Sequence, residues 1–84
     1  MTRLARLRAG QRGVIDSFHH SHHDPRLATR LMEMGLTVGS EIEVAYEAPF
    51  GGALAVRCRG TLIALRLGDA EIVEIRLTAG ADEP

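Results

Sequence analysis

This sequence has few of the residues that build cross-linked or membrane-spanning proteins. Its 84 residues include one cysteine, one tyrosine, two phenylalanines and no tryptophan. A single cysteine excludes a disulfide within the chain and a cysteine-based zinc knuckle, and it is typical of a reducing compartment. No apolar run approaches the ~20 residues that a transmembrane helix needs, and the N-terminus lacks a signal-peptide pattern. We therefore expect a cytoplasmic protein with no membrane insertion.

The chain also lacks an excess of charge of either sign. Ten basic and eleven acidic residues give a net charge of -1. This balance provides no long-range attraction for a phosphate backbone, so we expect no nucleic-acid partner. A chain this short buries one thin core and leaves little room for an enclosed catalytic cavity. Because no serine has a plausible base and no glycine-rich loop has the phosphate-binding pattern, we expect no enzymatic activity.

One helix is strongly indicated, from Pro25 to Met34. Asp24 is a suitable N-cap, and proline is favoured at the first helical position. Gly35 provides a left-handed end, and Leu36 can fold back on the last turn. The apolar stripe of this helix consists of Leu27, Leu31 and Met34, at the spacing of one helical face.

Most of the remaining chain alternates between apolar and polar residues, which is typical of half-buried antiparallel strands. A first strand is expected over Gly13 to Phe18, and later strands follow in EIEVAYE, ALAVRCRG, TLIALRL and EIVEIRL. The expected inward residues are Ile42, Val44, Tyr46, Leu54, Val56, Cys58, Ile63, Leu65, Leu67, Val73, Ile75 and Leu77. A short sheet leaves unpaired edges unless it closes. We therefore predict a mainly β protein: a small, partly open SH3-like barrel of about five strands, with one α-helix after the first strand. The domain should span residues 1–77, and a flexible polar tail should span 78–84.

The motifs and their order resemble the FeoA family, small cytosolic proteins of bacterial ferrous iron uptake. RLxxMGLxxG, from Arg30 to Gly39, is followed by APxG, from Ala48 to Gly51. The other matching residues are Leu4, Leu7, Gly10, Gly13, Ile15, Gly60, Ile63, Ala64, Leu65, Arg66 and Ala70. The resemblance implies a non-enzymatic accessory protein whose partner is the cytosolic part of a FeoB-type GTPase transporter. The same module is also attached to iron-dependent repressors, so a metal-binding regulatory module is the alternative.

All four histidines lie in one short segment, which the resemblance does not explain. They are His19, His20, His22 and His23. Neutral imidazole binds Zn²⁺, Ni²⁺ and Fe²⁺, so these residues are the candidate metal ligands. One interpretation is a solvated loop that binds such ions weakly and requires no cofactor. The other is a physiological metal sensor, although a fixed site needs at least three ligands with supporting hydrogen bonds.

The other candidate residues have structural explanations. Cys58 occupies an inward strand position, where cysteine behaves as a small apolar residue. Met32 and Met34 are expected to pack in the core, and the glutamates of EIEVAYE to line a solvated strand face. The charged residues best suited to contact an acidic partner are Arg57, Arg59 and Arg66, which we expect to form a basic strip across a hairpin.

Overall fold

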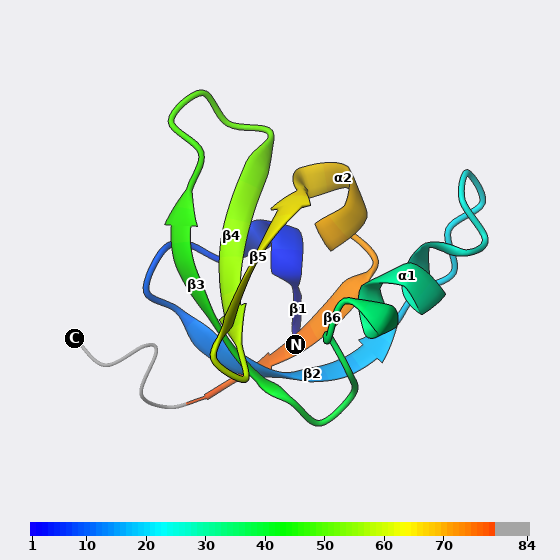
Figure 1. Ribbon diagram of the computed structural model, residues 1–84, viewed down its shortest axis with the longest axis horizontal. Coiled ribbons are helices and arrows are strands. Elements are labelled where there is room, and N and C mark those ends of the chain that lie inside the picture. The colour runs from blue at the N-terminus through cyan, green and yellow to red at the C-terminus, as the bar shows by residue number, and fades with distance from the viewer. Residues whose placement is uncertain (79–84) are drawn as a thin grey trace.

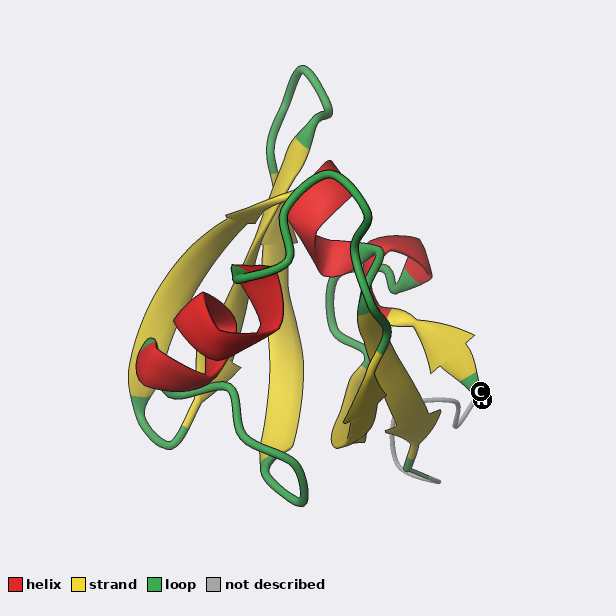
Figure 2. Ribbon diagram, turned by 90° about the vertical axis from the view of Figure 1, so that its right-hand side faces the viewer, coloured by secondary structure: helices red, strands yellow, loops and turns green. Residues whose placement is uncertain are grey.

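Six antiparallel strands form one bent sheet in the computed structural model, which describes residues 1–78 (Figure 1). The elements are β1 (Thr2–Arg3), the 3₁₀ helix η1 (Leu4–Arg6), β2 (Arg12–Phe18), α1 (Leu27–Glu33), β3 (Glu41–Glu47), β4 (Ala53–Cys58), β5 (Thr61–Arg66), α2 (Leu67–Ala70) and β6 (Val73–Leu77). The strand order is β1-β6-β2-β3-β4-β5, which leaves β1 and β5 as edges. Figure 2 shows the sheet bent into two facing halves.

The predicted mainly β fold is confirmed, with the helix α1 inserted after β2. The five expected strands correspond to β2–β6. No residue pattern predicts β1, whose two residues pair with Ile75 and Glu74 of β6. The sheet is open rather than closed. The predicted 1–77 domain lies within the described residues, whereas nearly all of the predicted tail, residues 79–84, lies outside them.

The expected inward faces are largely correct. The buried core includes Leu4, Leu7, Ile15, Leu27, Leu31, Leu36, Ile42, Val44, Leu54, Val56, Cys58, Ile63, Leu65, Val73 and Ile75. Tyr46 is an error, because 54% of it is exposed. The β3–β4 pairing shifts between Val44 and Tyr46, and such a bulge reverses the alternation of the residues that follow.

Leu67 and Leu77 pack against the core, as expected of inward residues, but both are only partly buried. Leu67 does not continue β5, which ends at Arg66. Instead it begins α2, the single helical turn Leu67–Ala70. Ala70 at the end of this turn is fully buried, so the change of direction brings a small residue into the core.

The helix α1 is shorter at its start than predicted. Asp24 does not cap the first helical turn. Its carboxylate oxygen Oδ1 accepts from the Arg26 N–H at 3.1 Å, and its carbonyl oxygen accepts from the Leu27 N–H at 3.1 Å. Such side-chain bonds two residues ahead form a turn of their own. Asp24 and Pro25 therefore form a turn that precedes the helix.

The predicted end of this helix is confirmed. Gly35 has a φ of 111°, in the region that favours glycine. The Leu36 N–H donates to the Leu31 carbonyl at 3.0 Å, and the Gly35 N–H donates to the Met32 carbonyl at 3.0 Å. This pair of bonds is a Schellman-type helix end. Leu36 is then fully buried, but Met32 and Met34 are 40% and 46% exposed, so the predicted core packing of both methionines is wrong.

Replacing Gly35 with valine is expected to destabilise the protein by about 1 kcal/mol or more, because a β-branched residue resists positive φ. Thermal unfolding followed by circular dichroism measures the effect. Met34→Val is the matched control, since Met34 has an ordinary φ of -78°. Equal melting temperatures for the two variants would show that the left-handed conformation of Gly35 is not required.

Candidate functional site

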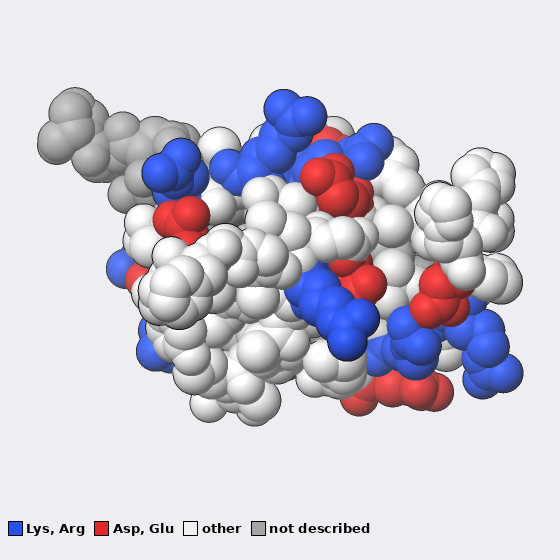
Figure 3. All heavy atoms as spheres, turned by 90° about the horizontal axis from the view of Figure 1, so that it is seen from above, with Lys and Arg blue, Asp and Glu red and all other residues white. Residues whose placement is uncertain are grey.

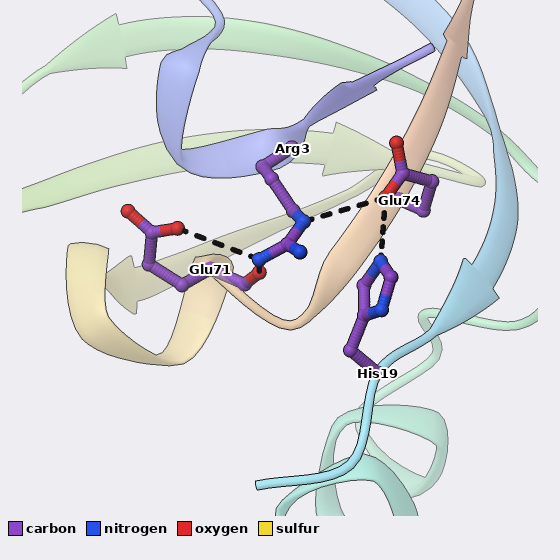
Figure 4. Close-up of polar contacts among 4 residues, drawn as sticks. All are labelled: Arg3, His19, Glu71 and Glu74. Carbon is purple, nitrogen blue, oxygen red and sulfur yellow. Dashed lines mark hydrogen bonds and ion pairs between the residues drawn. The ribbon is translucent and has the colours of Figure 1, made fainter.

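The first histidine of the predicted metal site belongs to an ionic cluster on the sheet. His19 follows β2, and its Nε2 donates to Glu74 Oε1 on β6 at 2.5 Å. Arg3 of β1 contacts the same carboxylate oxygen, with its Nε 3.3 Å away, and Arg3 also donates to the Glu71 carbonyl oxygen at 2.9 Å. Figure 4 shows Arg3 between the two glutamates, and Arg3 and His19 both reaching Glu74.

The contacts in this cluster lower the pKa of the Glu74 carboxyl. The bond from His19 holds the pKa of the Glu74 carboxyl below its usual value, and the charges of His19 and Arg3 add to the effect. A lowered pKa makes a contribution to stability that is present above the unfolded-state pKa and is lost as the pH falls through the folded-state pKa. The His19 N–H also donates to the Ile72 carbonyl at 2.7 Å, so this histidine is held at both its main chain and its ring.

The other three histidines lie further along the loop and are exposed to solvent. The rings of His20 and His22 meet edge to face, with centroids 5.1 Å apart and planes at 86°. Asp24, at the end of the loop, accepts a hydrogen bond from the Arg26 N–H and forms an ion pair with Arg30. Within residues 1–78, no group of three or more histidine, cysteine, aspartate or glutamate side chains is arranged to hold a metal ion.

We expect the four histidines to be dispensable for folding. Replacing His19, His20, His22 and His23 together with serine should leave a folded protein, and EDTA should leave the melting temperature of the parent almost unchanged. A structural metal would contribute directly to folding. Zn²⁺ or Ni²⁺ should bind the parent loosely, with an affinity that falls below about pH 6.5 as imidazole protonates.

Calorimetric titration with each metal, alongside melting curves with and without chelator, measures both effects. A large loss of stability with EDTA would contradict the prediction, as would a tight stoichiometric site that the serine variant lacks.

A second candidate site is a shallow groove lined by three arginines at one end of the sheet. Arg12 comes from β2, Arg57 from β4 and Arg59 from the β4–β5 turn, and Glu41 and Glu43 line the same groove. Arg12 Nε lies 3.9 Å from Glu43 Oε2, and an Arg57 terminal nitrogen lies 3.5 Å from Glu43 Oε1. One carboxylate is therefore shared between two guanidinium groups. We name this surface the arginine groove.

Arg59 is the residue that the turn geometry singles out. Its φ is 55°, and Gly60 follows with a φ of 81°. Two successive residues with positive φ form the type I′ turn that suits a two-residue hairpin, where asparagine and glycine are the usual residues. Arg59 therefore has a backbone conformation that is uncommon for residues other than glycine. Its side chain is exposed and places a cation at the turn. No ion pair of Arg59 occurs within residues 1–78.

The basic strip predicted from the sequence is only partly formed. Arg57 and Arg59 do line one groove, but Arg66 lies at the other end of β5, opposite Ala53. Arg12 replaces it, because β2 runs beside β3 and brings residue 12 opposite Glu43. Sequence alternation within one hairpin could not indicate this, since the missing arginine comes from a different pair of strands.

Comparison with known proteins agrees with this fold and these motifs. A sequence profile of the FeoA domain matches residues 2–77. The FeoA protein of Chlorobium tepidum is 34% identical, with a TM-score of 0.83, over 98% of this chain and 74% of that chain. The chain belongs to the FeoA family. This places it among proteins associated with ferrous iron transport, and the resemblance inferred from the sequence motifs is confirmed.

Two other solved structures have the same fold as this FeoA chain. FeoA of Stenotrophomonas maltophilia, an SH3 domain protein solved in complex with zinc, is 28% identical with a TM-score of 0.79, over 90% of this chain and 91% of that chain. A manganese-dependent transcriptional repressor has the same fold at 19% identity and a TM-score of 0.79, but this chain spans only 41% of it. No significant match was found among curated proteins.

The tip of the β3–β4 hairpin is a prominent exposed part of this FeoA chain. The β3–β4 hairpin projects from the body (Figure 1), and Phe50 at its tip is fully exposed. Figure 3, which looks down on this end of the molecule, shows a broad uncharged area beside mixed acidic and basic side chains. An aromatic residue among uncharged turn residues was the signal for an exposed apolar tip.

Cys58 is buried as predicted, with 2% of its surface exposed. Burial raises the pKa of the thiol, while the nearby charge of Arg59 acts in the opposite direction. The thiol lies 3.6 Å from the Gly35 carbonyl oxygen. A buried thiol with a raised pKa is a poor nucleophile and a poor metal ligand, so Cys58 contributes to packing between β4 and the end of α1.

Proposed function

We propose that this protein is a non-enzymatic accessory protein of ferrous iron uptake, acting in the cytoplasm by binding the cytosolic part of a FeoB-type GTPase transporter. The observation that carries the proposal is the FeoA profile match over residues 2–77, nearly the whole described chain. No helix in residues 1–78 is long and apolar enough to cross a membrane.

The arginine groove is the surface that we assign to this contact. Arg12 and Arg57 compete for Glu43, at 3.9 Å and 3.5 Å, so each keeps guanidinium donors for another acceptor. Arg59 adds an exposed cation at the turn. Guanidinium groups bind carboxylates in a planar, two-bonded geometry, and complementary charge mainly increases the rate and specificity of association. The groove therefore suits an acidic segment of the partner.

Binding to the purified cytosolic part of a FeoB-type transporter tests the proposal. Calorimetry at low salt should show a weak interaction that weakens further at high salt, because exposed charges are screened. The double variant Arg57→Glu, Arg59→Glu should reduce the affinity about tenfold or more, equivalent to about 1.4 kcal/mol. Arg66→Glu is the control, since it makes one such charge reversal at the far end of β5, and it should change the affinity by much less than half as much in free energy.

Two outcomes would separate the parts of this proposal. No interaction at high micromolar concentration would argue against the transporter as partner. Binding that the double variant and the control reduce equally would leave the partner in place and would remove the arginine groove as its contact surface.

The second candidate function is a metal-binding regulatory module that uses the histidine loop. One contact favours it: Glu74 holds the His19 ring at 2.5 Å, and carboxylates commonly orient histidine ligands in this way. Adding Zn²⁺ or Fe²⁺ to the binding experiment tests it. A metal-dependent change in transporter affinity, lost in the four-serine variant, would support regulation through this loop, and equal binding with and without metal would exclude it.

A further inference from the structure

The outer edge of β5 carries main-chain groups with no partner in the described sheet. β5 pairs with β4 on one side and stands last in the strand order. The Leu67 N–H donates to the Gly52 carbonyl at 2.9 Å, which continues the ladder of bonded pairs past the end of β5. Since bonded and non-bonded pairs alternate in an antiparallel ladder, the N–H and C=O groups of Leu62, Ala64 and Arg66 point outward.

This edge lacks the features that normally protect an exposed strand. Natural edges are short, bulged, covered, or interrupted by proline or lysine. β5 has six residues and no proline or lysine. Its pairing with β4 is continuous, whereas the β2–β6 and β3–β4 ladders both contain a register shift. The opposite edge, β1, is only two residues long. Leu62 on β5 is a large apolar residue with 49% of its surface exposed.

A groove runs beside the end of this edge, and both charged and apolar residues line it. The end of β5, from Ala64 to Arg66, forms one side of the groove, and α1 forms the other. Leu27 and Leu31 of α1 lie buried beneath the groove, whereas Met34 is 46% exposed. Asp24, Arg30 and Asp69 also line it. A strand laid along β5 would meet the main-chain donors and acceptors of the edge, with Met34 and these charged side chains nearby.

We propose that a second copy of this chain pairs with this edge, so that two β5 strands join antiparallel about a two-fold axis at Ala64. In this register Ala64 faces Ala64 of the second copy, and Leu62 faces Arg66. All three of these residues have outward main-chain groups, so each facing pair exchanges both N–H···O bonds. This dimer does not depend on the transporter contact proposed above.

Charge and side-chain size favour this register over its neighbours. The small Ala64 side chains meet at the axis without a clash. Each Arg66 lies over an exposed Leu62, which the aliphatic part of the arginine can cover. A register that placed the two Arg66 residues opposite each other would bring like charges together, which destabilises a cross-strand pair. A register centred on Leu62 would shorten the paired segment.

The size of the interface predicts a weak dimer. One strand pair and the rim of the groove fall below the roughly 1,200 Å² of total buried surface that stable complexes exceed. We expect a dissociation constant of about 10–500 µM. Sedimentation equilibrium on the full chain from about 10 µM to about 1 mM should then show an average mass that rises from monomer toward dimer.

The main-chain N–H groups of β5 provide the decisive readout. Across the same concentrations, the amide groups of Leu62, Ala64 and Arg66 should become more protected from hydrogen exchange. The amides of Ile63 and Leu65, already bonded to β4, should change little. A concentration-dependent change confined to another surface would overturn the proposal, and so would a monomeric mass at about 1 mM.

A matched pair of variants tests the same bonds. Ala64→Pro removes an outward N–H without touching the β4 ladder, at the kind of edge position where proline is tolerated. It should weaken the dimer at least about tenfold. Ala64→Thr keeps the N–H and should still dimerise. A folded Ala64→Pro protein that dimerises like the parent would overturn the proposal. If that variant does not fold, the exchange data on the parent decide.

Discussion

Gly13→Ala is expected to destabilise the protein by about 2–3 kcal/mol or more, although it adds a single methyl group. Gly13 lies in β2 between two partners, opposite Ile42 of β3 and Leu77 of β6. A Cβ at this position would lie 2.3 Å from Ile75 Cγ2 and 2.8 Å from the Arg76 carbonyl oxygen. The isoleucine side chain can adjust, but the carbonyl oxygen belongs to a paired strand, so the sheet itself must shift.

Chemical denaturation followed by circular dichroism measures this loss. Gly68→Ala is the matched control, because a Cβ there meets no atom within 4 Å and alanine is favoured over glycine in a helical turn. The control should unfold at the same denaturant concentration as the parent or slightly above it. If Gly13→Ala behaved like Gly68→Ala, the close contact between β2 and β6 would not be a requirement of the fold.

Leu4→Ala is expected to cost about 2–5 kcal/mol, the range for truncating a fully buried leucine. Leu4 is 0% exposed and lies in η1, which packs against α2 and β6. The truncation leaves a cavity where η1 meets the rest of the core. In a domain of this size that loss is a large part of the total stability.

The same denaturation experiment applies here, with Val38→Ala as the control. Val38 is 60% exposed, so its truncation should change the free energy of unfolding by less than about 0.5 kcal/mol. A small effect of Leu4→Ala would mean that η1 does not unfold cooperatively with the sheet and that the core is stable without it.

The sequence alone determined the features that depend on neighbouring residues. The end of α1 at Gly35 follows from a local need for positive φ, and the alternation in β3–β6 follows from the two-residue period of a strand. These patterns, with the spacing between RLMEMG and APFG, were enough to predict a mainly β fold and the FeoA family. The histidine loop was identified as a segment, but its metal binding stays a prediction.

Tertiary structure decided whatever depends on which strands become neighbours. The bulge that exposes Tyr46 arises from the pairing of β3 with β4. Arg12 joins Arg57 and Arg59, and Arg66 does not, because β2 lies beside β3 in the sheet. His19 meets Glu74 across 55 residues of sequence. No local pattern encodes such contacts, since the register between distant strands is fixed by packing of the whole core.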